Sequence, residues 1–309
     1  MLHVLVLGAA AGGGLPQWNC NCPVCRAAIE HPALRSTQAS AAVSADGSNW
    51  FLINAAPDLR QQIIDNPQLH PRHGLRDSPI AGVILTNGDV DAVAGLLHLR
   101  ESQAFTVYGH ERVLAVLRDN SIFNVLDPRY VKREAIALET PVSLRLPDGT
   151  ESGIEIVPLA LPGKVALYLE DATASGPGFG TRAGDTLGLH VRNRRNGAHF
   201  FYLAACAELT PELRDRVAGA PLVFFDGTLF RDDEMIEAGL GSKTGKRMGH
   251  MSMSGGDGSI AAFDGLGVGR KVFLHINNSN RALLPDTAER AHVSRAGWEI
   301  PADGTEIIL

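Results

Sequence analysis

Short apolar runs, each ended by a Gly- or Asp-rich turn, follow one another through most of this sequence and predict many β-strands. The runs lie at residues 2–7, 39–44, 49–54, 80–85, 106–108, 142–146, 154–159, 186–191, 199–204, 222–225, 272–275 and 306–309. Helical patterns at 92–100, 210–217, 259–263 and 287–296 are fewer, and a Gly-rich loop is expected at 174–185. Because strands follow one another before the helices, we expect an α/β (α+β) fold with two mixed sheets and helices on the outside. No linker interrupts the pattern, which favours a single domain over residues 1–309.

Composition restricts the class of protein. Hydrophobic residues are 45% and charged residues 20% of the 309 residues, which is typical of a soluble globular chain. The net charge of −6 argues against a general affinity for nucleic acids, because phosphate binding needs a positive field. No apolar run reaches the roughly eighteen residues of a membrane span, and the N-terminal run lacks the basic residue of a signal peptide. We therefore expect a cytoplasmic protein with reduced cysteines.

Three of the four cysteines, Cys20, Cys22 and Cys25, fall within six consecutive positions. Structural zinc sites use four tetrahedral ligands that are commonly Cys or His. The loop at about residues 15–30 supplies three thiolates, so the fourth ligand must come from a distant segment. A disulfide between Cys20 and Cys22 would be strained and would leave Cys25 single. The pattern favours a structural zinc ion over three unrelated core cysteines.

Two carboxylates, Asp89 and Asp91, follow the apolar run at 80–85 and precede a helical pattern. Carboxylates at the end of a strand can hold a cation or orient a substrate. The alternative is that one of them caps the helix, which would explain one acid but not both.

Two histidines lie in polar loops near the C-terminal end. His250 follows a basic, Gly-rich stretch, and His275 ends an apolar run and leads into three nearby asparagines. Each histidine alone is more often structural, but together with Asp91 they form a candidate metal site. The stretch before His250 lacks the phosphate-loop spacing, and the glycine run at 8–14 lacks G-x-G-x-x-G, so both argue against a nucleotide site. We expect the glycine run to let the backbone pass close to another segment.

Seven ordered blocks together resemble a known family. They read LGAAAGGG, PQWNCNCPVC, NAAPDLRQQI, TNGDVDAVAGLL, FDGT, KTGKRMGH and HINNSN. In this order, from residue 5 to the C-terminal end, they are similar to the coenzyme PQQ synthesis protein B (PqqB) family of the metallo-β-lactamase superfamily. The resemblance implies that superfamily's αββα sandwich.

The resemblance also implies that the superfamily's two-metal hydrolytic centre is largely lost. Hydrolases of the superfamily carry T-H-x-H-x-D-H, and the same frame here begins at Thr86. Its first two histidines are Asn87 and Asp89, and only Asp91 is kept. The metal-bridging aspartate falls near Cys206. A residual phosphodiesterase or lactamase activity is therefore disfavoured.

In PqqB-like sequences Asp91 and His275 are joined by a histidine where this chain has Ala92. Two histidines and a carboxylate form the facial triad of non-haem iron oxygenases. The resemblance thus implies Fe²⁺-dependent hydroxylation of the tyrosine ring of a Glu–Tyr precursor cut from the PqqA peptide. Ala92 cannot bind a metal, so we expect weak or absent iron unless Asp89, His250 or water completes the shell.

The resemblance further implies roles for the residues around this site. His250 is expected to transfer protons or bind substrate, and Asp226 to orient it, with a turn cap as the alternative for Asp226. The fourth zinc ligand falls at Asn278, a poor ligand for zinc.

An older proposal for the family is transport of PQQ or its precursor to the periplasm. In such a carrier, Lys243, Lys246 and Arg247 could hold the ligand's carboxylates. Expected partners are the PQQ precursor or PQQ. A homodimer and contacts with other proteins of the pathway stay open.

Overall fold

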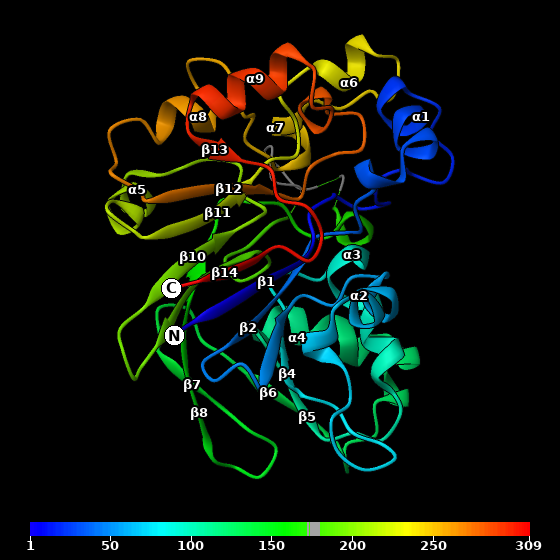
Figure 1. Ribbon diagram of the computed structural model, residues 1–309, viewed down its shortest axis with the longest axis vertical. Coiled ribbons are helices and arrows are strands. Elements are labelled where there is room, and N and C mark those ends of the chain that lie inside the picture. Colours follow the sequence, from blue (N-terminus) through cyan, green and yellow to red (C-terminus); the bar gives the residue numbers. More distant parts are fainter. Residues whose placement is uncertain (172, 174–179) are drawn as a thin grey trace.

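The computed structural model describes residues 1–171, 173 and 180–309, and its central feature is a pair of stacked β-sheets (Figure 1). The first sheet has the strand order β14-β1-β2-β3-β4-β5-β6. Its strands are β1 (His3–Gly8), β2 (Ser40–Ser44), β3 (Trp50–Ile53), β4 (Ile80–Ile84), β5 (Phe105–Gly109), β6 (Val131–Ala135) and β14 (Glu306–Ile308). Pairing is antiparallel from β14 to β3 and parallel from β3 to β6.

The second sheet repeats this arrangement with the strand order β13-β12-β11-β10-β9-β8-β7. Its strands are β7 (Val142–Arg145), β8 (Glu151–Ala160), β9 (Leu187–Asn193), β10 (His199–Leu203), β11 (Leu222–Asp226), β12 (Arg270–Leu274) and β13 (Trp298–Glu299). Pairing is parallel from β13 to β10 and antiparallel from β10 to β7. The parallel halves matter for function, because parallel strands bring the loops at their carboxyl ends to one edge.

Short helices cover the outer faces of the sheets. The α-helices are α1 (Pro23–Glu30), α2 (Leu59–Asp65), α3 (Val90–Val93), α4 (Glu111–Asp119), α5 (Pro211–Val217), α6 (Glu234–Glu237), α7 (Gly245–Met248), α8 (Ser259–Ala262) and α9 (Ala288–Arg295). The 3₁₀-helices are η1 (Pro32–Leu34), η2 (Pro67–Leu69), η3 (Ala94–Leu99), η4 (Ser121–Val125), η5 (Leu167–Leu169) and η6 (Arg281–Leu283). Helices α2 and α4 lie on the first sheet, and α5, α8 and α9 lie on the second (Figure 1). No helix in the described part of the chain has the length and apolar character needed to cross a membrane.

The core is divided into layers that match this architecture. The largest cluster, which includes Val43, Phe51, Ile156 and Phe224, lies between the two sheets. A second cluster lies under α2 and α4, and a third under α5, α8 and α9. Burial of apolar area at about 25 cal/mol per Å² on both faces of each sheet is what holds these layers together.

The strand pattern is confirmed at nearly every run, and so is the pair of sheets covered by helices. The helix expected at 92–100 is instead the short α3 followed by the 3₁₀-helix η3. Helices α1, α2, α4, α6 and α7 and strands β6 and β13 were not anticipated, although the buried face of α4 follows helical spacing. Part of the Gly-rich loop expected at 174–185, namely 174–179, lies outside the described residues.

Candidate functional site

The chemistry-bearing residues gather at the carboxyl ends of three parallel strands. Asp91 follows β4, Asp226 ends β11, and His275 directly follows β12. Strands β11 and β12 are neighbours, whereas β4 belongs to the other sheet. The site therefore lies between the two sheets, where the carboxyl ends of their parallel strands meet.

Asp91 and His275 contact each other across this junction. The Asp91 Oδ2 atom lies 3.0 Å from His275 Nε2. Burial alone would lower the pKa of His275, but the hydrogen bond and charge of Asp91 outweigh it and raise this pKa. Burial alone would raise the pKa of Asp91, but His275 lowers it in return. The two form a charge-assisted pair, and their predicted role as metal ligands stays a prediction.

The backbone on both sides of this pair is unusual. His275 has a left-handed φ of 58°, a region that residues other than glycine seldom adopt and that is often found at functional sites. A Cβ on Gly12 would lie 3.4 Å from Asp91 Oδ2, and the backbone of Ala11 donates to the carbonyl of Ile276. The glycine run thus passes close to the site, which confirms the expectation for it.

A second group of side chains contacts the Nδ1 side of the His275 ring. Asp226, His250 and His275 offer ligand atoms that all lie within 4.8 Å of one another. The hydroxyl of Thr228, however, lies 3.0 Å from His275 Nδ1 and 3.1 Å from His250 Nδ1. The two rings also stack, with centroids 5.1 Å apart. These contacts describe a hydrogen-bond network around Thr228 that leaves Nε2 of His275 directed at Asp91.

Asp226 anchors this network. Its Oδ2 lies 2.6 Å from His250 Nδ1 and accepts from the Cys206 N–H at 2.9 Å, while Oδ1 accepts from the Thr228 N–H at 2.9 Å. The side chain is fully buried. Asp226 therefore contacts His250 and also bonds the turn that follows it, and its predicted role in orienting His250 stays a prediction.

Asp89 lies beside the pair without joining it. It occupies the N-cap position of α3 but makes no side-chain capping bond, and its Oδ1 accepts instead from the Leu167 N–H at 3.2 Å. Burial raises the pKa of Asp89, and the charge of Asp91 raises it further. Its predicted catalytic role stays a prediction.

A small cavity adjoins the Asp91–His275 pair. Its lining comprises Ala39, Asn54, Thr86, Asn87, Asp91, Ala92, Tyr202, Ala204, Ala205 and His275. The free volume is about 10 Å³, close to the space of one water molecule. Ala92 is 2% exposed and presents only a methyl group here. The structure thus places Ala92 beside the two predicted ligands.

The three basic residues expected to bind an anion are largely engaged elsewhere. Lys246 Nζ lies 2.6 Å from Asp257 Oδ2, and an Arg247 guanidinium N lies 3.1 Å from Glu170 Oε2. The charge of Lys243 lowers the pKa of the same Glu170, after the larger effect of a hydrogen bond from Lys164. Binding of an anionic ligand by these residues stays a prediction and requires them to exchange partners.

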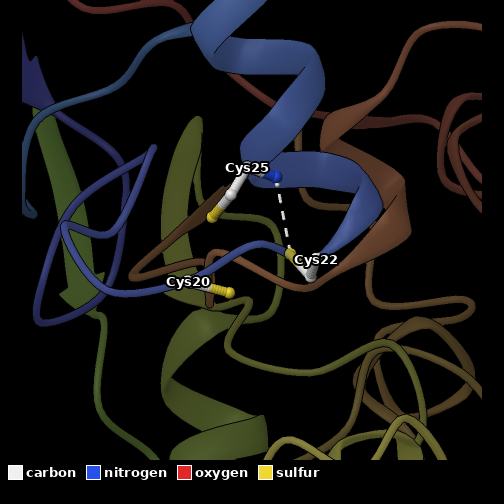
Figure 2. A group of neighbouring side chains, drawn as sticks. All are labelled: Cys20, Cys22 and Cys25. Atoms are coloured by element: carbon white, nitrogen blue, oxygen red, sulfur yellow. Dashed lines mark hydrogen bonds between the residues drawn. The ribbon is translucent and has the colours of Figure 1, made fainter.

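The three clustered cysteines converge on one point. Figure 2 shows their sulfur atoms turned toward one another, and all three lie within 4.8 Å of each other. Cys22 caps α1, and its Sγ accepts from the Cys25 N–H at 3.4 Å. Burial raises the pKa of Cys22 to about 12, and the neighbouring cysteines raise it as well. Three thiols drawn together in this way are a ligand set that suits zinc.

Asn278 completes the surroundings of this cluster, as the register implied. Its Nδ2 donates to Cys25 Sγ at 3.1 Å, and its backbone carbonyl lies 3.8 Å from Cys22 Sγ. Rotating the amide by half a turn would present an oxygen to the cluster. Three thiolates and an oxygen donor are a set that fits zinc, with the fourth ligand the weakest.

Known proteins of one family are similar to this chain over its whole length. Coenzyme PQQ synthesis protein B from Rhodopseudomonas palustris (strain TIE-1) is 61% identical over 310 residues that span all of both chains. The protein of that name from Bradyrhizobium diazoefficiens is 60% identical over 312 residues, again over both full chains. The chain belongs to the coenzyme PQQ synthesis protein B family. The Zn²⁺-bound PqqB from Methylobacterium extorquens has a TM-score of 0.93 at 47% identity, covering 99% of this chain and 100% of that one.

The same comparisons settle the fold of this PqqB family member. A family model described as a beta-lactamase superfamily domain matches residues 49–276. A diphosphatase of the PhnP family has a TM-score of 0.69 at 19% identity, with 99% of this chain and 96% of that chain covered, and this shows likeness of fold alone. The predicted metallo-β-lactamase αββα sandwich is confirmed.

Sequence reasoning missed three side chains of the site. Thr228 joins the two histidines, while Asn54 and Tyr202 line the cavity. Thr228 could have been found in the FDGT block, since it lies two residues after Asp226. Tyr202 sits inside an ordinary apolar strand and carries no sequence signal.

Proposed function

We propose that this chain acts in the biosynthesis of PQQ, through hydroxylation of the tyrosine ring of a Glu–Tyr precursor beside Asp91 and His275. The contact between these two residues at 3.0 Å, next to a small cavity, is the observation that carries the proposal. The name shared by relatives up to 61% identical supports the pathway. The facial-triad chemistry of a carboxylate and histidine supports the class of reaction.

The residues present fit iron only in part. Asp91 and His275 supply two of the three protein ligands of a facial triad, and Ala92 supplies none. When bound, ferrous iron would supply the activation of oxygen. Because one ligand is missing, we propose low occupancy and impaired turnover in this chain. Thr228 and Asp91 fix the ring of His275, while Asp226 holds Nδ1 of His250 and leaves its other nitrogen to move a proton.

A structural zinc ion is the second part of the proposal. Cys20, Cys22 and Cys25 would hold it, with Asn278 as the weak fourth ligand. The Zn²⁺-bound state of the relative from Methylobacterium extorquens supports zinc as the metal. Bound there, zinc would stabilise the loop before α1 and its contact with the segment after β12.

The test of the hydroxylase compares this chain with Ala92→His. Each protein is supplied with Fe²⁺, a reductant, oxygen and the Glu–Tyr dipeptide, and gain of one oxygen atom in the ring is followed by mass spectrometry. We expect the variant to form product at least about tenfold faster, because it gains the third ligand. Ala92→Leu, which fills similar space without a ligand atom, is the matched control. An iron-loaded, folded Ala92→His protein that forms no product contradicts the proposal.

Ala92 itself favours a second candidate function. A site that has lost one metal ligand suits a carrier that binds PQQ or its precursor without turnover. Of the three basic residues predicted to hold the ligand, Lys246 and Arg247 form ion pairs, so Lys243 is the one to test. Calorimetry with PQQ separates the two functions, because a carrier must bind it saturably and Lys243→Ala must weaken that binding. Absence of saturable binding removes the carrier.

A further inference from the structure

The hydroxyl of Tyr202 is a buried polar group whose proton has no acceptor among the described residues. Tyr202 lies on β10 and is 1% exposed. In the part of the chain that the structure describes, its oxygen has no partner at full hydrogen-bonding geometry, although the Asn54 amide acts on it as a nearby donor. A buried phenol usually finds an acceptor or donor, because leaving the hydroxyl unsatisfied is costly. In native structures, an unpaired buried group of this kind is usually explained by a bound water molecule, an ion or a functional role.

The surroundings show where the missing partner belongs. Tyr202 lines the same small cavity as Asp91, His275 and Asn54. Burial raises the pKa of Tyr202, the Asp91 carboxylate raises it further, and the Asn54 amide opposes both. The hydroxyl therefore lies within electrostatic reach of Asp91.

Asn54 cannot take the role of partner in full. Its Oδ1 accepts from the Thr86 N–H at 2.9 Å, and its Nδ2 donates to the Thr86 hydroxyl at 2.9 Å. The residue itself has a left-handed φ of 63°, so its amide is fixed in this position. Asn54 has one N–H left, which acts as a donor toward the Tyr202 oxygen and lowers its pKa, so the Tyr202 proton still lacks an acceptor.

The size and polarity of the cavity point to a single small occupant. About 10 Å³ admits one water molecule and nothing larger. A water molecule is stably buried where two to four polar groups surround it, and Tyr202, Asp91 and Asn54 supply such groups. The plain alternative is a dry core tyrosine whose hydroxyl is merely tolerated.

We propose that Tyr202 is a positioning residue of the site, whose hydroxyl donates to one buried water molecule that in turn donates to the Asp91 carboxylate. This water holds Asp91 in the orientation in which it meets Nε2 of His275. This arrangement belongs to the metal-free site, in which Asp91 and His275 contact each other directly. Tyr202 thereby acts on the site through Asp91.

The test replaces Tyr202 with phenylalanine, which removes the hydroxyl and keeps the ring. High-resolution crystal structures of the wild-type protein and of Tyr202→Phe are compared, together with their thermal unfolding. We expect wild-type density for a water molecule bonded to Tyr202 and Asp91. In the variant we expect this water to be lost, the Asp91–His275 contact to lengthen beyond hydrogen-bonding distance, and Tm to fall by about 2 °C or more.

Tyr108→Phe is the matched control. Tyr108 is equally buried, and its hydroxyl accepts from the Arg145 N–H at 3.2 Å, outside the residues that line the cavity. Its replacement should leave the Asp91–His275 contact unchanged whatever it does to Tm. A dry cavity in the wild-type protein overturns the proposal. So does a Tyr202→Phe protein with an equal or higher Tm and an unchanged contact, which is the result expected of a tolerated, unbonded hydroxyl.

Discussion

Asp91 and His275 meet at 3.0 Å although 184 positions separate them in the chain. One follows a strand of the first sheet and the other a strand of the second, so the contact exists only when both sheets are stacked. Each residue shifts the pKa of the other toward its charged form. The site is therefore a product of the sandwich as a whole.

The zinc site predicts a specific loss of metal. Purified wild-type protein should retain about one zinc ion per chain after loosely held metal is removed with a chelator, whereas Cys25→Ser should retain well under half of that. The reason is that two thiolates and a weak oxygen donor do not hold zinc as three thiolates do. Elemental analysis of both proteins measures the ratio.

Cys206→Ser is the control for this experiment. Cys206 is buried outside the cluster, and its Sγ donates to the carbonyl of Glu208 at 3.1 Å, a bond that serine can replace. Its zinc content should equal that of the wild type. Equal zinc in Cys25→Ser and wild type would remove the cysteine cluster as the binding site.

Asn278 predicts that the affinity for zinc can be raised. Asn278→Asp places an anionic oxygen where an amide now faces Cys25, and carboxylate oxygens are ordinary zinc ligands. We expect about tenfold tighter binding in competition with a chromogenic chelator, which corresponds to about 1.4 kcal/mol. Asn277→Asp, next in the chain but bonded to Ser279, should leave the affinity unchanged. Unchanged binding in Asn278→Asp would exclude this residue as the fourth ligand.

The substitution Asp226→Asn should cause a large loss of stability, although it exchanges a single heavy atom. Asn at this position replaces one of the two oxygens, which now accept from Thr228, Cys206 and His250, with an N–H₂ group that cannot accept. The free energy of unfolding, measured with urea, should fall by about 3 kcal/mol because a buried charge-assisted network is broken. Asp264→Asn, at an exposed position, should stay within about 0.5 kcal/mol of wild type. A similarly small change in Asp226→Asn would show that the network contributes little.

The stability of the folded protein should depend on pH through a histidine pair away from the site. His190 on β9 contacts His199 on β10, with 3.1 Å between Nε2 and Nδ1. Burial lowers the pKa of His190 to about 4, and the charges of His199, Arg192 and Arg216 lower it further, while Glu155 opposes them. In the unfolded chain His190 has an ordinary pKa near 6.5, so between about pH 6.5 and pH 4 it binds a proton that it does not bind in the folded chain. The contribution of His190 is complete above pH 6.5 and is lost as pH falls to about 4.

This loss is measured by urea unfolding at pH 7 and pH 5 for wild type and His190→Phe. The phenyl ring can keep the stacking on Phe201, whose centroid lies 4.4 Å from that of His190, but it cannot titrate. We expect the wild type to lose about 1 kcal/mol more than the variant between these pH values, a figure reduced from the full shift because the ring is partly exposed. His73→Phe, which alters an exposed histidine, should behave as wild type. Parallel losses in wild type and His190→Phe would contradict the assignment.

The sequence alone was sufficient for most of the strands and for the cysteine cluster. Strands such as β4 and β11 are continuous apolar runs with polar turns, and this pattern depends only on neighbours in the chain. Cys20, Cys22 and Cys25 are close in space because they are close in sequence. Helix α1 was missed because Pro23 and the cysteines on either side of it obscure the helical spacing that its buried residues show.

The tertiary structure decided the rest. It brought Asn278 to the cysteines and His275 to Asp91, and it showed Thr228 between two histidines and Tyr202 at the cavity. It also showed Lys246 and Arg247 engaged in ion pairs. These outcomes depend on which strand ends meet when two sheets stack, and burial of apolar faces drives that stacking without regard to the polar residues carried at the strand ends. Local pattern therefore determines the elements of this protein, and only long-range packing determines which side chains share a site.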